Sequence, residues 1–302
     1  MKKVLLLILI LILSASLIAC STEDTPSVSM EEEEVASIVP EKIIIGAIPT
    51  QNQGDMKAAM DKLGEHFSEE LGTEVIVEVY PDYNGVVEAM NYGQVDMAYF
   101  GPLTYIIANE TGGAEAIMTL LVNGEPYYYS YMVVHADSDI NSLDDIIDNV
   151  EDLQFAFADV NSTSGSLIPT LALKERGVFR DQTDTDFKQI FYTGGHDAAA
   201  LSVQEKKVEV GAVDSAIFEV MKRNNVIDGE QFRVIWQSEP LFQYPWAVKK
   251  GTSDELKEAF VNAFLSVDDS EILDVFGASG FAPAEDKDYE PVRQAAKADG
   301  RL

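Results

Sequence analysis

Three successive hydroxyl side chains stand in the middle of the chain, in DVNSTSGSLIP at residues 159–169. Ser162, Thr163 and Ser164 are followed at once by Gly165, which lets a ligand approach the backbone closely. A helix that begins here would add backbone N–H groups without partners and a partial positive charge. Such a turn can bind an oxyanion with no basic side chain beside it. The alternative is a simple helix cap, for which one hydroxyl would suffice.

The position of a proline limits where the regular helix can start. Inside a helix, Pro169 would break the turn that contains Gly165. We therefore expect the hydroxyls to lie on one tight turn, with the regular helix starting near Pro169.

A histidine and an aspartate follow two later strands. In YTGGHDAAALSVQ, residues 192–204, two glycines turn the chain and His196 opens a helix. Asp214 ends the next strand in GAVDS. Side chains at such strand-to-helix turns often face a ligand in α/β folds. His196 is therefore a candidate binding residue, with a capping or surface histidine as the alternative, whereas His66 and His135 are expected to be structural or exposed.

Tyrosines supply further hydrogen-bonding groups. PDYNG places Tyr83 at a turn that opens a helix, and NGEPYYYSY places Tyr127, Tyr128, Tyr129 and Tyr131 in a strand. Side chains alternate between the two faces of a strand, so these four tyrosines point to both sides. A buried tyrosine hydroxyl needs a partner, so some of them are binding candidates and others pack in the core.

The elements that must position these residues alternate between β-rich and helical runs, which predicts α/β layers with mainly parallel strands. The predicted strands are residues 42–48, 74–80, 95–100, 116–122, 129–136, 153–159, 187–193, 208–214, 232–238 and 245–250. Apolar residues at helical spacing over 56–71 and 256–264 predict two helices, the second capped by Thr252 or Ser253.

The strands fall into two sets, which predicts two lobes with a ligand cleft between them. We expect one lobe to contain residues 41–134 and 244–302, with helices over 253–299 completing it, and the other to contain residues 135–243. The chain would cross near His135 and return near residues 237–244.

The N-terminal residues predict export and a lipid anchor. Lys2 and Lys3 precede VLLLILILIL, an apolar run too short for a comfortable membrane span. LIAC, ending at Cys20, looks like the lipobox of bacterial lipoproteins; a plain secretion signal is the alternative. We expect residues 1–19 to be a signal peptide, Cys20 to be lipidated, and residues 20–40 to form an acidic tether.

Composition excludes several classes of function. The chain has 52 acidic and 21 basic residues and a formal charge of −31, which disfavours nucleic acid as a partner. Cys20 is the only cysteine, and no His, Cys or Asp spacing suggests a metal site. We expect a monomer without cofactors.

Six segments in order resemble the substrate-binding lipoproteins of ABC importers for phosphonate, phosphite and phosphate. They are PDYNG, GQVDMAYFGPLTY, GEPYYYSYMVV, NSTSGSLIP, GGHDAAALSV and GASGFAPAEDKDYEPVR, and the resemblance covers about residues 43–295. The resemblance implies a type II periplasmic-binding-protein fold, with two α/β lobes joined by two crossing segments. It implies a location at the cell surface or in the periplasm, with an ABC permease and its ATPase as partners.

The resemblance also implies roles for individual residues. Ser162, Thr163 and Ser164 would hold the phosphorus oxygens, and His196 would donate to one of them. Tyr83 and Tyr128 would reach the ligand from the first lobe.

The chain departs from family members that bind aminoalkylphosphonates. Where those members place carboxylates around the amine, this sequence has Ala216 and Tyr244. The departure favours phosphite, methylphosphonate or phosphate over 2-aminoethylphosphonate. Asp214 lies nearby and is expected to accept the proton of a P–OH group.

Two alternatives belong to other classes of function. Ser164, His196 and Asp214 are the residue types of a hydrolase triad, but no GxSxG elbow surrounds the serine, so we expect no enzyme. A binding protein of the same fold for a sulfonate, a carboxylate or a vitamin precursor is the other alternative.

Overall fold

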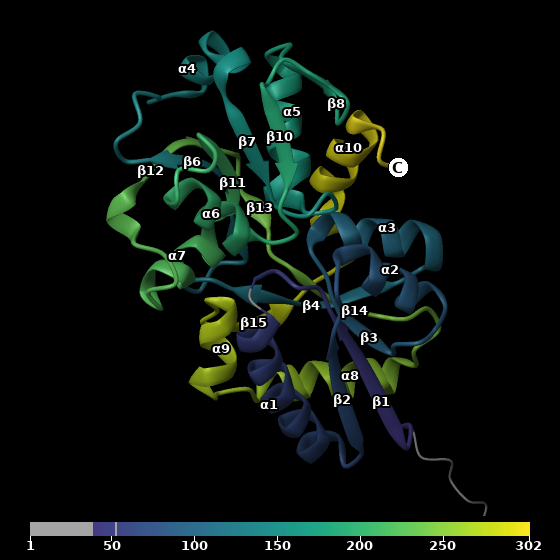
Figure 1. The fold of residues 1–302 in the computed structure, drawn as a ribbon. Helices are drawn as coiled ribbons and strands as arrows, with labels where there is room; N and C mark the ends of the chain where they lie inside the picture. Colours follow the sequence, from purple (N-terminus) through teal and green to yellow (C-terminus); the bar gives the residue numbers. More distant parts are fainter. Residues whose placement is uncertain (1–38, 52) are drawn as a thin grey trace, which may run out of the picture. The chain divides into compact units, whose positions relative to one another are not determined.

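The computed structural model describes residues 39–51 and 53–302, which form two mixed β-sheets flanked by helices (Figure 1). The first sheet has the strand order β15-β4-β14-β3-β1-β2, and the second has the order β10-β7-β11-β6-β12. The strands of the first sheet are β1 (Lys42–Ala47), β2 (Glu74–Val79), β3 (Met97–Tyr99), β4 (Glu115–Leu121), β14 (Pro245–Val248) and β15 (Gly280–Pro283). Those of the second are β6 (Ser130–His135), β7 (Gln154–Phe157), β10 (Gln189–Tyr192), β11 (Val210–Asp214) and β12 (Phe232–Gln237).

All ten predicted strands form, each within two residues of its predicted ends. The expectation of mainly parallel strands is wrong, however. The two sheets contain four parallel strand pairs and five antiparallel pairs. Each antiparallel pair contains β6, β14 or β15, whose direction is opposite to that of the strand beside it.

Two segments carry the chain between the sheets, and they pair with each other. β5 (Tyr127–Tyr128) and β13 (Leu241–Phe242) form a short antiparallel ladder. β6 pairs with β11 and β12, so it belongs to the second sheet. We therefore move the first proposed lobe boundary from residue 135 to residues 122–129. The chain has a two-lobe α/β fold.

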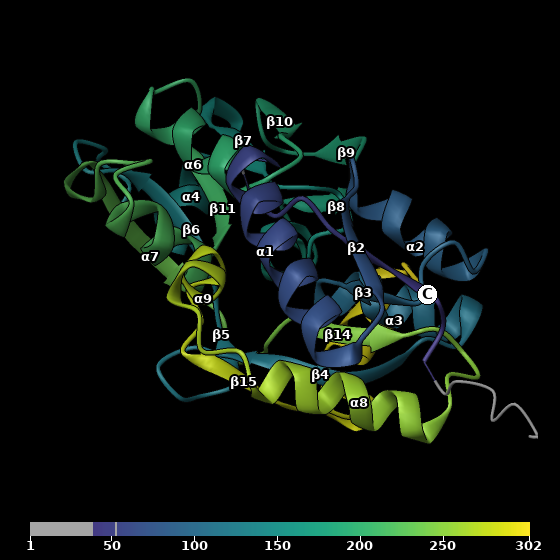
Figure 2. The same cartoon turned by 90° about the horizontal axis from the view of Figure 1, so that it is seen from below.

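Helices cover both sheets (Figures 1 and 2). The α-helices are α1 (Gln53–Leu71), α2 (Tyr83–Asn91), α3 (Pro102–Gly112), α4 (Leu143–Asp148), α5 (Ile168–Glu175), α6 (His196–Gln204), α7 (Ser215–Arg223), α8 (Asp254–Leu265), α9 (Ser270–Phe276) and α10 (Glu290–Asp299). α1 packs on β2 and α8 on β4, while α2 and α3 pack together on β1, β3 and β14. Smaller elements are the hairpin of β8 (Phe179–Asp181) with β9 (Asp184–Thr185), and the short helices η1 (Val150–Asp152), η2 (Thr163–Leu167), η3 (Gly229–Gln231) and η4 (Asp286–Tyr289).

Local capping explains where α8 begins. Ser253 accepts from the Leu256 N–H at 3.2 Å, so of the two predicted candidates it is the cap of α8.

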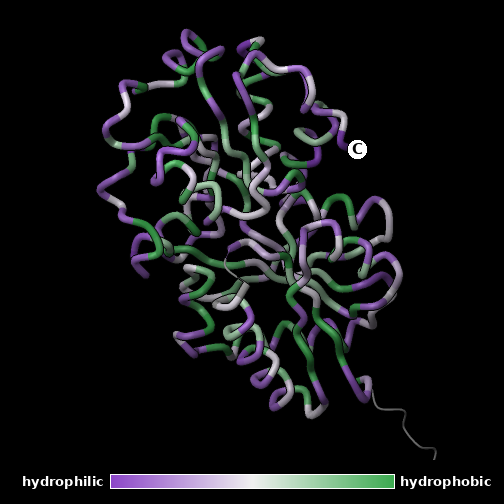
Figure 3. Tube along the Cα trace, viewed as in Figure 1, coloured by the Kyte–Doolittle hydropathy of each residue, from purple (hydrophilic) through white to green (hydrophobic). Residues whose placement is uncertain are grey.

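The residues expected to be helical over 253–299 also contain β15, which pairs with β4 at the sheet edge. Hydrophobic residues follow the strands of both sheets, and hydrophilic residues lie on the outer helices and turns (Figure 3).

Among the described residues no helix is both long and apolar enough to cross a membrane. The predicted signal peptide and Cys20 lie outside the described residues.

Candidate ligand-binding site

The hydroxyl turn lies between the end of β7 and the start of α5. Its residues form a single wide helical turn, η2, and α5 starts at Ile168, as Pro169 predicted. Ser162 caps the turn, because its Oγ accepts from the Gly165 N–H at 3.0 Å. Thr163 Oγ1 accepts from the Leu103 N–H, in the first turn of α3, at 2.8 Å. The turn is therefore tied to a helix of the first sheet.

Helix beginnings gather around this turn. α2 begins at Tyr83, α6 begins at His196, and Asp214 caps α7. Each helix start carries a partial positive charge, which favours an anion without a formal cation. Among the described residues the charged residues that are buried as a whole are Asp159, Asp214 and Arg293. Arg293 pairs with carboxylates of α3, η4 and α10, so it contributes no charge here.

His196 is fully buried, and its surroundings select one neutral tautomer. Its Nδ1 accepts from the Asp214 backbone N–H at 3.2 Å, so Nε2 carries the proton. Nε2 lies 3.3 Å from the Tyr244 hydroxyl and 3.5 Å from Ser162 Oγ. Burial lowers the pKa of His196 to about 3, so it stays neutral at physiological pH. It can donate a hydrogen bond but supplies no positive charge.

Asp214 is the buried carboxyl of this site. Its Oδ1 accepts from the N–H groups of Ala216 and Ile217 at 2.7 and 3.0 Å. Oδ2 has no hydrogen-bond partner within the protein. Burial raises the pKa of Asp214 to about 7, although these N–H groups and the Tyr244 hydroxyl lower it. Near neutral pH the carboxyl can therefore hold or release one proton.

Four buried tyrosines lie within electrostatic reach of this carboxyl. Tyr83, Tyr99, Tyr128 and Tyr244 are each no more than 2 % exposed. Burial raises the pKa of each well above its ordinary value, and the negative charge of Asp214 raises all four further. The tyrosines therefore remain protonated and can donate hydrogen bonds.

Polar atoms without partners are concentrated here. Ten buried side-chain atoms of the described residues have no hydrogen-bond partner within the protein. Four of them are predicted site atoms: the hydroxyls of Tyr83, Tyr128 and Ser164, and Asp214 Oδ2. Leaving one such group unpaired costs about 1–3 kcal/mol, so four together indicate a place built for a polar ligand.

The site joins the two sheets. The backbone N–H of His196 donates to the Thr50 carbonyl at 3.1 Å. The side chains of Thr163 and His196 contact Leu103 and Tyr244, which lie on the first sheet's side. All seven predicted ligand-contacting residues, Tyr83, Tyr128, Ser162, Thr163, Ser164, His196 and Asp214, are buried. Tyr99 was not predicted; its only signal is a polar aromatic residue at the end of a buried strand.

The positions that the resemblance linked to amine binding are apolar or aromatic here. Ala216 is buried in the first turn of α7. Tyr244 stacks on Tyr99 with ring centroids 5.5 Å apart and contacts Tyr128 at 5.3 Å. The one fully buried carboxylate among the described residues is Asp214, one of whose oxygens already accepts two N–H groups.

Comparison with known proteins gives a consistent result. The family model of the periplasmic substrate-binding protein of phosphonate ABC transporters matches residues 45–289. The phosphate-import protein PhnD of Mycolicibacterium smegmatis is 31% identical, over 93% of this chain and 92% of that protein.

Solved structures agree. The binding component of a phosphonate ABC transporter from Pseudomonas aeruginosa has a TM-score of 0.78 and 26% identity, over 86% of this chain and 87% of that one. PhnD1 of Prochlorococcus marinus, solved with methylphosphonate, has a TM-score of 0.77 and 23% identity, over 87% of this chain and all of that one.

Proposed function

Because the chain belongs to the family of periplasmic substrate-binding proteins of phosphonate ABC transporters, we propose that it binds a phosphorus oxyanion without an amine. The ligand would be phosphite, methylphosphonate or phosphate, held between the two sheets. The protein delivers its ligand to an ABC importer outside the cytoplasm, as the family does.

The four unpaired polar atoms carry this proposal. Ser164, Tyr83 and Tyr128 each offer a hydroxyl, His196 offers Nε2–H, and Asp214 offers one oxygen. A tetrahedral oxyanion has several acceptor oxygens that can take such donors at once. Hydrogen bonds to a charged group contribute about 1.5–3 kcal/mol each, so a few suffice for the roughly −8.2 kcal/mol of micromolar affinity.

The first test is a ligand panel measured by thermal shift on residues 28–302, purified free of ligand. We expect phosphite, methylphosphonate or phosphate to raise the melting temperature by about 5–10 °C at a hundredfold excess over Kd. 2-Aminoethylphosphonate should have a much smaller effect, because Ala216 and Tyr244 offer no carboxylate to its ammonium group. The panel also contains sulfate and a sulfonate.

Two results would contradict the proposal. A shift with a sulfonate and none with any phosphorus oxyanion would move the protein to another ligand class. A larger shift with 2-aminoethylphosphonate than with methylphosphonate would show that Asp214 or Asp159 serves the amine.

A second prediction concerns pH. Since burial raises the pKa of Asp214 to about 7, we expect the complex to keep one proton between this carboxyl and a ligand oxygen. Above pH 7 both free partners lose that proton, so the affinity should fall about tenfold per pH unit. His196 does not contribute, because burial lowers its pKa to about 3.

Asp214→Asn is the matched variant, since its amide oxygen can still accept from the two N–H groups and its NH2 group can donate to a fully deprotonated ligand without a titrating proton. Calorimetric titration with methylphosphonate from pH 6 to 9 should show a steep loss for the unmodified protein and a nearly flat profile for the variant. If the affinity of the two proteins fell equally with rising pH, Asp214 would not be the group that holds the shared proton.

The anchor and the partners complete the proposal. Lipidation at Cys20 would tether the protein to the membrane through the acidic segment 20–40, and an ABC permease with its ATPase would accept the ligand. We further propose that the protein acts as a monomer, needs no cofactor and catalyses no reaction.

A further inference from the structure

Arg301 contacts the hydroxyl turn and the segment just before it. The residue follows α10, and its guanidinium donates to the Val160 carbonyl and, at 3.2 Å, to Ser166 Oγ. Ser166 is fully buried within η2, two residues after Ser164. The side chain of Arg301 therefore contacts the turn at Ser166 and the segment just before it at Val160.

Local structure holds this arginine in one orientation. Gly300 ends α10 with a φ of 75°, a left-handed conformation that favours glycine, and the Arg301 N–H then donates back to the Ala296 carbonyl at 2.9 Å. Arg301 Nε donates to Asp299 at 2.6 Å, and Asp299 also pairs with Lys174 of α5 at 2.6 Å. The side chain of Asp299 is only 5% exposed, so this contact is shielded from water.

The helix that carries Arg301 is itself fixed to the first sheet's side. Arg293 of α10 bonds to Glu110 and Asn109 of α3, and the hydroxyl of Tyr289 donates to the Gln243 carbonyl at 3.1 Å. α3 also supplies the Leu103 N–H to Thr163. Figure 1 shows α10 beside both α3 and α5, which it contacts. The turn is thus held by α3 through Thr163 and by Arg301 through Ser166.

We propose that Arg301 is a positioning residue for oxyanion binding. It acts through Val160 and Ser166, which it fixes so that the hydroxyls of Ser162, Thr163 and Ser164 face the ligand. The planar guanidinium fork can bind both acceptors at defined angles, which an ammonium group cannot. Because its guanidinium bonds to Val160, Ser166 and Asp299, none of which is a predicted ligand contact, the arginine works by geometry rather than by bonding to the anion. This inference rests on the proposed function.

The experiment compares Arg301→Gln and Arg301→Lys with the unmodified protein, with methylphosphonate as the probe. We expect both variants to bind about tenfold more weakly, chiefly through faster dissociation in stopped-flow fluorescence. The melting temperature without ligand should change by less than about 2 °C, since the contacts of Arg293 and Tyr289 still hold α10.

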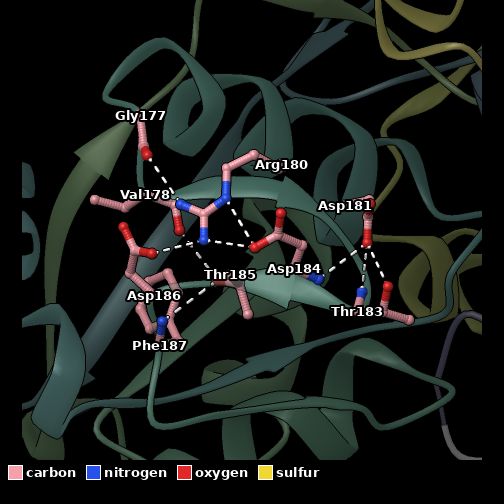
Figure 4. Close-up of polar contacts among 9 residues, drawn as sticks. All are labelled: Gly177, Val178, Arg180, Asp181, Thr183, Asp184, Thr185, Asp186 and Phe187. Atoms are coloured by element: carbon pink, nitrogen blue, oxygen red, sulfur yellow. Dashed lines mark hydrogen bonds and ion pairs between the residues drawn. The ribbon is translucent and has the colours of Figure 1, made fainter.

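Arg180→Gln is the matched control. Arg180 also pairs with carboxylates and a carbonyl in the second lobe, namely Asp184, Asp186 and Gly177, but this cluster lies at the exposed β8–β9 hairpin (Figure 4). The affinity of the Arg180→Gln variant for methylphosphonate should equal that of the unmodified protein.

Ser166→Ala removes the acceptor and leaves Arg301 in place. It should weaken binding, and the double variant Ser166→Ala with Arg301→Gln should lose less than the product of the two single losses, because they remove one shared contact. Fully multiplicative losses would contradict the inference.

Other outcomes separate this inference from the proposed function. Unchanged affinity in Arg301→Gln, or full recovery in Arg301→Lys, would overturn the positioning role while the ligand assignment stood. If the unmodified protein bound no phosphorus oxyanion, the proposed function would fail, and the inference with it.

Discussion

Replacing His196 with alanine is expected to weaken the binding of methylphosphonate by about a hundredfold. The change removes the Nε2–H donor, and hydrogen bonds to charged groups contribute about 1.5–3 kcal/mol, or tenfold to more than a hundredfold in affinity. It also leaves the Asp214 N–H without its acceptor, Nδ1, at the centre of the site. Calorimetric titration measures the loss directly.

His196→Asn separates ligand binding from folding. The asparagine oxygen can take the place of Nδ1 and accept from the Asp214 N–H, but no donor remains at the position of Nε2. We therefore expect a melting temperature close to that of the unmodified protein and an affinity as poor as that of the alanine variant. An asparagine variant that binds within threefold of the unmodified protein would show that Nε2 does not contact the ligand.

Replacing Gly165 with alanine should abolish most binding through a different cause. A Cβ at this position would lie 2.4 Å from the Ala158 Cβ and 2.9 Å from both His196 Cε1 and Ser162 Oγ. All three neighbours are buried, so the turn must move away from β7. We expect a loss of affinity of at least a hundredfold and a decrease in the free energy of unfolding of about 1–3 kcal/mol.

Gly101→Ala is the control for this prediction. Gly101 precedes α3 near the same site, but a Cβ there would meet its neighbours at ordinary distances of 3.6–3.7 Å. Urea unfolding and calorimetry on both variants should show a severe defect for Gly165→Ala alone. Normal affinity in Gly165→Ala would mean that the turn can shift without cost and that its close packing is not required.

The hydroxyl turn shows which features can be predicted from a short stretch of sequence. The placement of the hydroxyls on one turn and the helix start near Pro169 follow from short-range rules of backbone geometry, and both are confirmed. His196 opens α6 as predicted, because two glycines end the preceding strand run. The use of these residues for a ligand stays a prediction.

Strand direction and edge pairing were not predictable in the same way. β15, residues 280–283, lies in a segment that was expected to be helical, and it is a strand because β4 offers it an unpaired edge. β6 was assigned to the wrong lobe, since its partners β11 and β12 lie far along the chain. Such choices depend on contacts between distant residues, about which periodicity carries no information.

By itself the sequence determined the positions of ten strands, the turn of three hydroxyls and the family resemblance, because these depend on patterns within a few residues. Only the tertiary structure decided that Tyr244 stacks on Tyr99, that the Asp214 N–H selects the tautomer of His196, and that Arg301 contacts Ser166 of the turn. These arrangements bring together residues from opposite ends of the chain. Contacts between the two lobes create them, and burial then sets the proton affinity of His196 and Asp214.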